Sequence, residues 1–336
     1  MDHSRRQFLK ASAAAAAGVV TTPVAGGTLT RNHGAVVRTI VSLFNTLPGD
    51  VALKIFAPSV ECKPPLQALL NSSRKLFVAS ANKTFVLCEA LRQADAPDVD
   101  VVLEETKLAL DSTVWSFGSP IFNPPHLSGV VSERTALEAM ITRSDNTATD
   151  MTFKLLGANS VRRFIAAAHL NNTLIPDSTR AFAGYVFGAS NYLTLTWEQL
   201  VQIVQGPLVH PFFNSVQTLA SSAHDLVSYY LPALEGEFFQ HAATLNEFRR
   251  ILTLCDFIYR VPLPLGVSAY AKSGDADSPG FHARSIAGGM FFQDRWVYFA
   301  FIINWYALAD HDFETVNQFF KGIHHSLTLV KDVLSD

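Results

Sequence analysis

Hydrophobic residues near the start of the chain recur first at helix spacing and then at strand spacing. Between Arg31 and Leu47 the apolar positions repeat every three to four residues, which predicts an amphipathic helix. Pro48 and Gly49 then predict the end of that helix. Apolar positions alternate with others over residues 51–55, and this period is typical of a strand with one buried face.

The C-terminal part of the chain shows both periods in the opposite order. Residues 286–292 and 296–303 predict two strands joined by a turn over residues 293–295 (Gln-Asp-Arg). Apolar positions over residues 312–334 then predict a closing amphipathic helix.

The middle of the chain is mostly helical in pattern. From Ser80 to about Leu91 apolar residues lie on nearly every side of the predicted helix, which indicates a helix in the protein interior. Residues 101–170 predict further helices, interrupted by a loop at 116–127 that is rich in Gly and Pro. Residues 171–191 predict a loop, and helices continue to about Cys255.

Strands at both ends of the chain and helices between them predict an α/β fold of the α+β type. An antiparallel sheet is expected to form from both chain ends, flanked by the terminal helices, with an all-helical lobe inserted into it. The expected boundaries are about 31–78 and 262–336 for the sheet lobe, and about 79–261 for the helical lobe.

Composition narrows the class of protein. The 336 residues are 49% hydrophobic and 16% charged, which is ordinary for a globular protein with a large core. The formal net charge of −3 comes from scattered charges and offers no basic face for phosphate groups. We therefore expect no nucleic-acid partner.

The N-terminus carries an export signal. Arg5 and Arg6 precede an Ala-rich apolar stretch from Ala11 to Val20 and a small-residue region near Gly27. This pattern predicts a twin-arginine signal over residues 1–27, so the twin-arginine translocation machinery is an expected partner. The apolar stretch is too short for a stable membrane span. We expect a mature catalytic domain over residues 28–336, in the periplasm or secreted.

The chain has three cysteines, so at most one intramolecular disulfide can form among Cys62, Cys88 and Cys255. Cys88 lies in an apolar run, where a buried free thiol is the favoured role.

No cysteine or histidine spacing indicates zinc, and we expect neither a metal nor another cofactor. His224 and Asp225 are interpreted as solvated helix residues, as are His324 and His325.

Three short polar clusters occur in a fixed order: Ser80 with Lys83, then the run 144–146 (Ser-Asp-Asn), then the run 272–274 (Lys-Ser-Gly). Each cluster alone is a weak signal, because such short spacings occur by chance. The ordered set resembles the active-site motifs of class A β-lactamases and penicillin-binding proteins, a superfamily of serine hydrolases. Residues 136–150 are also similar to the class A sequence around its second motif. The resemblance implies a five-stranded antiparallel sheet with an inserted helical lobe.

The residue types fit the chemistry of that superfamily. A serine hydroxyl needs a base to become a good nucleophile, and Lys83 lies three residues after Ser80 on one helix face. Lys83 must be neutral to accept a proton, so burial and the cation Lys272 would have to lower its pKa. Ser144 is suited to relay a proton to the leaving nitrogen, and Asn146 to hold Lys83 and the substrate amide. Asp145 is interpreted as a structural residue at the turn.

The remaining substrate-binding positions lie in the last cluster and just after it. Lys272 supplies positive charge, Ser273 a hydroxyl for the substrate carboxylate, and Gly274 a close approach to the substrate backbone. The resemblance implies an oxyanion hole formed by the backbone N–H groups of Ser80 and Asp275. An acidic side chain at 275 departs from the family and would repel the carboxylate of a β-lactam.

Arg284, and with less support His282, is a candidate anchor for that substrate carboxylate, because each follows the last cluster on the next predicted strand.

One motif of the class A enzymes is missing. They carry a Glu, in an E-x-x-L-N pattern, that activates the water which clears the acyl-enzyme. This chain has no such pattern, and its nearest carboxylates are Asp177 and Glu198. Glu198 is better interpreted as a helix first-turn residue beside a Thr196 cap, and Asp177 as a loop residue.

Three functions remain open on these grounds. The first is a β-lactamase that acylates Ser80 and hydrolyses the lactam amide. The second is a DD-peptidase or an esterase of the same fold. The third is a penicillin-binding sensor that is acylated without turnover, because the deacylating Glu is absent. The substrate in each case is a small molecule or a peptidoglycan-like peptide.

Overall fold

A five-stranded antiparallel sheet forms the centre of the molecule, as expected. The computed structural model describes residues 29–60, 64–255 and 263–335. The predicted signal, residues 1–27, and Cys62 lie outside these ranges. The sheet order is β2-β1-β9-β8-β7, so two strands from the N-terminal part lie beside three from the C-terminal part, and β1 and β9 join the two groups. The strands are β1 (Asp50–Ala57), β2 (Leu66–Leu70), β7 (Ser268–Ser278), β8 (Phe281–Phe292) and β9 (Arg295–Trp305).

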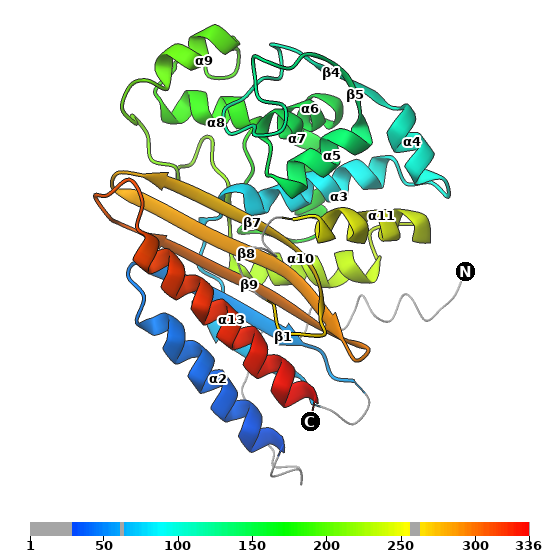
Figure 1. Ribbon diagram of the computed structural model, residues 1–336, viewed down its shortest axis with the longest axis vertical. Helices are drawn as coiled ribbons and strands as arrows, with labels where there is room; N and C mark the ends of the chain where they lie inside the picture. Colours follow the sequence, from blue (N-terminus) through cyan, green and yellow to red (C-terminus); the bar gives the residue numbers. More distant parts are fainter. Residues whose placement is uncertain (1–28, 61–63, 256–262, 336) are drawn as a thin grey trace.

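The terminal helices α2 (Leu29–Asn45) and α13 (Phe313–Ser335) lie side by side on one face of the sheet (Figure 1). Phe44 of α2 joins them to the core, because its ring stacks on Phe301 of β9 and meets Phe319 of α13 edge-on. The predicted amphipathic helices at both chain ends are therefore confirmed.

The opposite side carries the helical lobe, which contains most of the helices (Figure 1). Helix α10 packs directly against strands β1, β8 and β9, so it belongs to the cover of the sheet. The helices of this part are α3 (Lys83–Gln93), α4 (Val99–Glu105), α5 (Glu133–Thr142), α6 (Asn146–Leu156), α7 (Ala158–Ala167), α8 (Thr179–Val186), α9 (Trp197–Ile203), α10 (Ala223–Glu235) and α11 (Ala242–Thr253).

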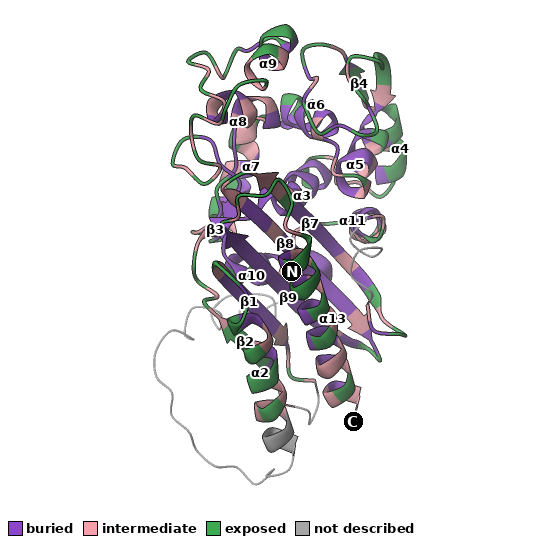
Figure 2. Cartoon of the chain, turned by 60° about the vertical axis from the view of Figure 1, so that its left-hand side comes forward, coloured by how far each residue is buried: buried purple, intermediate pink, exposed green. Residues whose placement is uncertain are grey.

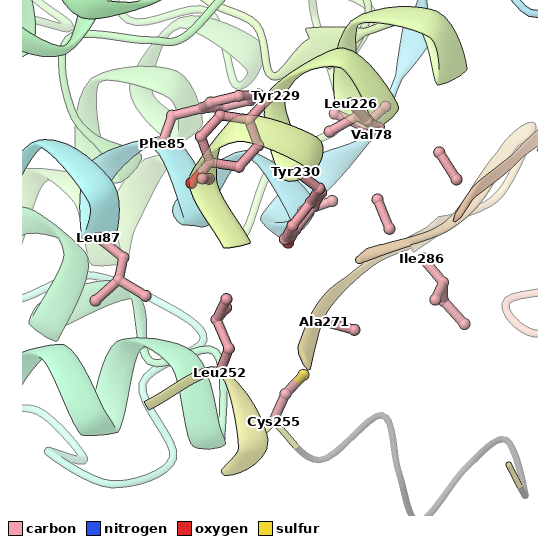
Figure 3. Packing of buried hydrophobic residues seen from close by; sticks show 14 of the residues in the cluster. Val78, Phe85, Leu87, Leu226, Tyr229, Tyr230, Leu252, Cys255, Ala271 and Ile286 are labelled. Atoms are coloured by element: carbon pink, nitrogen blue, oxygen red, sulfur yellow. The ribbon is translucent and has the colours of Figure 1, made fainter. Parts of the chain in front are cut away.

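Helix α3 is the buried centre of the lobe, as its apolar pattern predicts. All residues from Lys83 to Leu91 are buried. The rings of Phe85 and Tyr229 lie 4.6 Å apart, and this contact joins α3 to α10 (Figure 3). Figure 2 shows the same division: the central strands and α3 are buried, whereas the outer helices α4 and α9 expose much of their surface.

Two small sheets complete the fold. Strand β3 (Leu76–Phe77) pairs with β6 (Ala220–Ser221), and the 3₁₀ helix η1 (Ala79–Asn82) follows at once. Strand β4 (Lys107–Leu110) pairs with β5 (Gly129–Ser132) within a stretch that the sequence predicts as mostly helical.

The structure corrects two further expectations. Residues 171–191 do not form one loop, because Ser178 caps the short helix α8 by accepting a hydrogen bond from Ala181 N. Asp225 is not solvated: it is 3% exposed and accepts hydrogen bonds from Asn172, Thr173 and Ser222. A single-sequence pattern does not show the burial of Asp225, because its contacts with Asn172 and Thr173 join distant segments.

Cys88 is a buried free thiol, as expected, and Cys255 is buried as well. Within the described ranges, none of the helices has the length and apolar character needed to cross a membrane.

Candidate active site

The three polar clusters come together around one cleft of about 290 Å³. It lies where η1, the turn before α6 and strand β7 meet. The lining residues are Ser80, Gly118, Pro120, Arg143, Ser144, Asn146, Ser273 and Asp275. Three segments that are far apart in the sequence therefore supply one site.

Ser80 projects from η1, directly ahead of helix α3. The preceding residue, Ala79, has a φ of 46°, a conformation that costs energy for a residue with a Cβ. The turn is held by Val78, whose N–H donates to Leu219 O, and by Asn82, whose side-chain amide donates to Leu174 O. Ser80 thus occupies a fixed, strained turn at the positive end of α3.

Lys83 is the first residue of α3 and only 1% exposed. Its Nζ lies 2.5 Å from Ser144 O, 2.6 Å from Asn146 Oδ1 and 3.2 Å from Ser144 Oγ. These three contacts use all three donors of an ammonium group. In the neutral form the amine can instead accept a hydrogen bond from the Ser144 hydroxyl, so protons can pass between the two side chains.

Burial and, to a smaller extent, the positive charge of Lys272 lower the pKa of Lys83 to about 7, against the attraction of Asp145, Asp150 and Asp275. Near neutral pH a large fraction of Lys83 is therefore neutral. The amine has the proton affinity that a general base needs at that pH.

The turn from Ser144 to Asn146 faces Lys83. Ser144 has a φ of 56°, which makes it a second strained residue in the site. Asp145 is fully buried and accepts hydrogen bonds from the backbone N–H groups of Ile121, Phe122 and Ala148. It fixes the turn, in agreement with its predicted structural role. Asn146 donates from its side chain to Phe117 O, and this bond aims its oxygen at Lys83.

Strand β7 forms the opposite wall. It is an edge strand of the sheet, so part of its backbone faces η1 instead of another strand. Gly274 lies against η1: a Cβ at this position would be 2.2 Å from Val78 O and 2.7 Å from Ser80 N. Only glycine permits this approach. Lys272 is fully buried and its Nζ donates to Ser273 O, whereas Ser273 reaches the cleft.

Asp275 is exposed and lines the cleft beside Ser273. Its neighbour Gly274 touches the backbone of Ser80, so the amides of Ser80 and Asp275 belong to adjoining segments. This placement is compatible with the predicted oxyanion hole, which remains a prediction.

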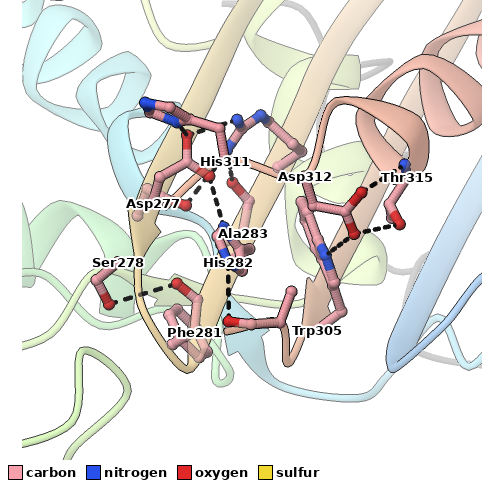
Figure 4. A network of polar contacts seen from close by, with 12 residues as sticks. Asp277, Ser278, Phe281, His282, Ala283, Trp305, His311, Asp312 and Thr315 are labelled. Atoms are coloured by element: carbon pink, nitrogen blue, oxygen red, sulfur yellow. Dashed lines mark hydrogen bonds and ion pairs between the residues drawn. The ribbon is translucent and has the colours of Figure 1, made fainter. Parts of the chain in front are cut away.

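Arg284 is engaged away from the cleft. Its guanidinium lies 3.0 Å and 2.7 Å from the two carboxylate oxygens of Asp277. His282 is fully buried and lies 2.8 Å from the same carboxylate (Figure 4). Burial alone would raise the pKa of Asp277, but the hydrogen bonds from Arg284 and His282 lower it overall. Neither Arg284 nor His282 is among the residues that line the cleft. Their predicted role as carboxylate anchors stays a prediction.

The loop carboxylates do not reach the cleft either. Asp177 binds Arg162 at 2.8 Å and Gln217 at 2.6 Å. Glu198 is exposed in the first turn of α9, whose predicted Thr196 cap is confirmed by a capping box with Gln199. Both line a separate cavity of about 590 Å³ that shares no lining residue with the cleft.

Two residues near the site escaped the sequence analysis. Arg143 lines the cleft, and only its position next to Ser144 could have indicated this. Asp150 accepts hydrogen bonds from the backbone N–H groups of Thr179 and Arg180, which fastens α8 to α6. Burial raises the pKa of Asp150 to about 6.

Comparisons with known structures agree with this architecture. The TLA-3 extended-spectrum β-lactamase superimposes with a TM-score of 0.68 at 15% identity, over 90% of this chain and 100% of that chain. A class A β-lactamase from Bacteroides cellulosilyticus gives a TM-score of 0.67 at 17% identity, over 91% and 99%. PBP-A gives 0.64 at 17% identity, over 91% and 97%. Identities this low show a shared fold. No curated protein sequence matches the chain.

Two sequence families match this chain. The twin-arginine signal sequence matches residues 2–22, so the protein is exported by the twin-arginine pathway. The β-lactamase enzyme family matches residues 63–290, which span all three polar clusters and more than half of the chain. The chain therefore belongs to the β-lactamase enzyme family.

Proposed function

We propose that this protein is a serine hydrolase that acylates Ser80 and hydrolyses the amide of a β-lactam. The single observation that carries the proposal is the contact of Lys83, with its pKa near 7, to Ser144 and Asn146 beside the nucleophile. Shifted pKa values of this kind cluster at sites of proton transfer, which supports the proposal.

Acylation proceeds in balanced steps. Neutral Lys83 takes the proton of Ser80, whose Oγ attacks the substrate carbonyl. The backbone N–H groups of Ser80 and Asp275 stabilise the oxyanion. Ser144 passes a proton from Lys83 to the leaving nitrogen as the C–N bond breaks. Lys272 lowers the proton affinity of Lys83, while Ser273 and Asn146 hold the substrate by hydrogen bonds.

Deacylation returns Ser80 to its starting state. Water adds to the acyl carbonyl and gives a proton to Lys83, and this proton passes to Ser80 Oγ as the C–O bond to Ser80 breaks and the acid product leaves. The lining residues of the cleft include no carboxylate from the loop around α8. We therefore expect slow deacylation, with Lys83 as the group placed to accept the proton of water.

A second candidate follows from this same observation. A DD-peptidase, an esterase or a penicillin-binding sensor of this fold would retain the acylation machinery and lack a dedicated water-activating carboxylate. PBP-A, which shares the fold, was solved in one variant as an acyl-enzyme complex with penicillin G.

Intact-mass spectrometry during incubation with a chromogenic cephalosporin separates the candidates. Colour with a transient adduct supports turnover of the lactam. A persistent adduct after one burst supports the sensor or the peptidase.

The variant Ser80→Ala should abolish both colour and adduct. The matched control Ser215→Ala removes an exposed hydroxyl from a loop outside the cleft and should change neither. If Ser80→Ala retains both signals, the nucleophile is another residue.

A further inference from the structure

The wall of the cleft on β7 carries an acidic side chain, that of Asp275, at the cleft surface. Asp275 is exposed there, next to Ser273, and one residue beyond the glycine that touches Ser80. Its charge is felt in the site, since it is one of the groups that favour the protonated form of Lys83.

The cations on this side do not face the cleft. Lys272 is fully buried, with its Nζ bound to Ser273 O. Arg284 has a side chain only 12% exposed and is paired with Asp277 through both carboxylate oxygens. Among the described residues that line the cleft, the one cation is Arg143, which comes from the opposite wall.

Geometry relates Asp275 to the leaving group. A substrate acyl carbon must lie at Ser80, and the group that departs must lie near Ser144, which donates its proton. Ser144, Ser273 and Asp275 line the same cleft of about 290 Å³. A leaving group held in this cleft therefore shares it with the carboxylate of Asp275, and there opposite charges attract and like charges repel.

We propose that Asp275 selects the substrate by charge: the cleft prefers acyl donors whose leaving group is cationic or neutral and disfavours those with a carboxylate beside the scissile bond. This inference rests on the proposed acylation of Ser80 and names the substrate class of that site. Within the proposed substrate class, the preferred substrates are accordingly lactams, or other amides and esters, whose leaving group is cationic or neutral. Lactams with a ring carboxylate are acylated more slowly than lactams without one.

The test compares two aryl acetates that differ in charge on the leaving phenol, one with a trimethylammonio group and one with a carboxylate. Each rate of Ser80 acylation is divided by the rate of hydroxide-catalysed hydrolysis of the same ester, which removes the difference in intrinsic reactivity. The measured quantity is the ratio of the two corrected kcat/KM values.

For the unmodified protein we expect this ratio to favour the cationic ester. In Asp275→Asn, which keeps the size of the side chain, the ratio should fall by roughly tenfold at low salt and less at high salt. Asp294→Asn is the matched control, because it removes the same charge from the exposed β8–β9 turn. Its ratio should stay unchanged.

Three results would overturn the inference. The ratio could favour the anionic ester; it could be unchanged in Asp275→Asn; or the anionic ester could depend on Arg143, shown by a selective loss in Arg143→Gln. In each of these cases the mass adduct on Ser80 still forms, so the proposed acylation stands. If no ester or lactam forms an adduct on Ser80, both proposals fail.

Discussion

Nζ of Lys83 lies 2.6 Å from Oδ1 of Asn146, so the amine beside the nucleophile on α3 is held by the first residue of α6. This contact joins α3 to α6 at the cleft. It also ties the charge state of Lys83 to the side chain at position 146. Two predictions follow from it.

The rate of acylation should depend on pH through Lys83. Because the pKa of Lys83 is lowered to about 7, its neutral form increases as the pH rises through that value. The acylation rate should rise about tenfold from pH 5 to pH 6 and level off above about pH 8. Stopped-flow measurement of the first turnover tests this. A flat profile, or full activity in Lys83→Met, would contradict the role of Lys83.

Asn146→Asp should shift that pH profile upward. A carboxylate in place of the amide favours the charged form of Lys83 and should raise its pKa by about one to three units. The midpoint of the acylation profile should move by the same amount. Asn146→Ala serves as the comparison, because it removes an acceptor and should move the midpoint down. Equal midpoints in all three proteins would show that Lys83 is not the titrating group.

Gly274→Ala should disable the site. The new Cβ would lie 2.2 Å from Val78 O, so β7 and η1 must move apart. We expect acylation to fall by at least about a hundredfold, since misplacement by about 1 Å is enough for such a loss. Gly34→Ala is the control, because its Cβ would meet only the flexible end of Arg38 at 3.5 Å. Near-normal acylation in Gly274→Ala would show that the close approach is not needed.

The stability of the protein should depend on pH through Asp150. Burial raises the pKa of Asp150 from 3.8 in the unfolded chain to about 6. The folded state then binds more protons than the unfolded state between these values, so its stability falls as the pH rises through this window. The total is roughly 3 kcal/mol by linkage. Asp150→Asn should lack this loss.

Urea unfolding of both proteins from pH 4 to pH 7 measures the difference. Asp100→Asn, which alters an exposed carboxylate in α4, should run parallel to the unmodified protein at every pH. A constant difference between the unmodified protein and Asp150→Asn would show that Asp150 is not titrating in the folded state.

Local patterns in the sequence predicted the fold well where they report on burial. Three features were predicted from apolar residues that the fold must bury. They are the apolar stripe along α2, the apolar surface of α3 and the strands near the C-terminus. Caps such as Thr196 were predicted as well, because capping depends on residues that are close in sequence. Helix α8 was missed because it is fixed by Asp150 from another helix.

Some features of the candidate site were likewise predicted from the sequence, and others were not. Ser80, Lys83 and the later clusters were found because motif spacing is visible in the chain. The pairing of Arg284 with Asp277 could not be predicted from spacing, since their contact depends on the register in which β8 pairs with β7. The cleft position of Arg143 likewise depends on how three distant segments meet.

The sheet order also has a consequence for the newly made polypeptide. Strand β1 pairs with β9 from Asp50↔Asn304 to Phe56↔Tyr298, and the cleft wall β7 begins only at Ser268. Long-range pairings of this kind form slowly and late. A chain still being synthesised therefore has no acylating site until nearly all of it has left the ribosome. Any truncation that removes the last three strands of the sheet leaves a nucleophile without a pocket.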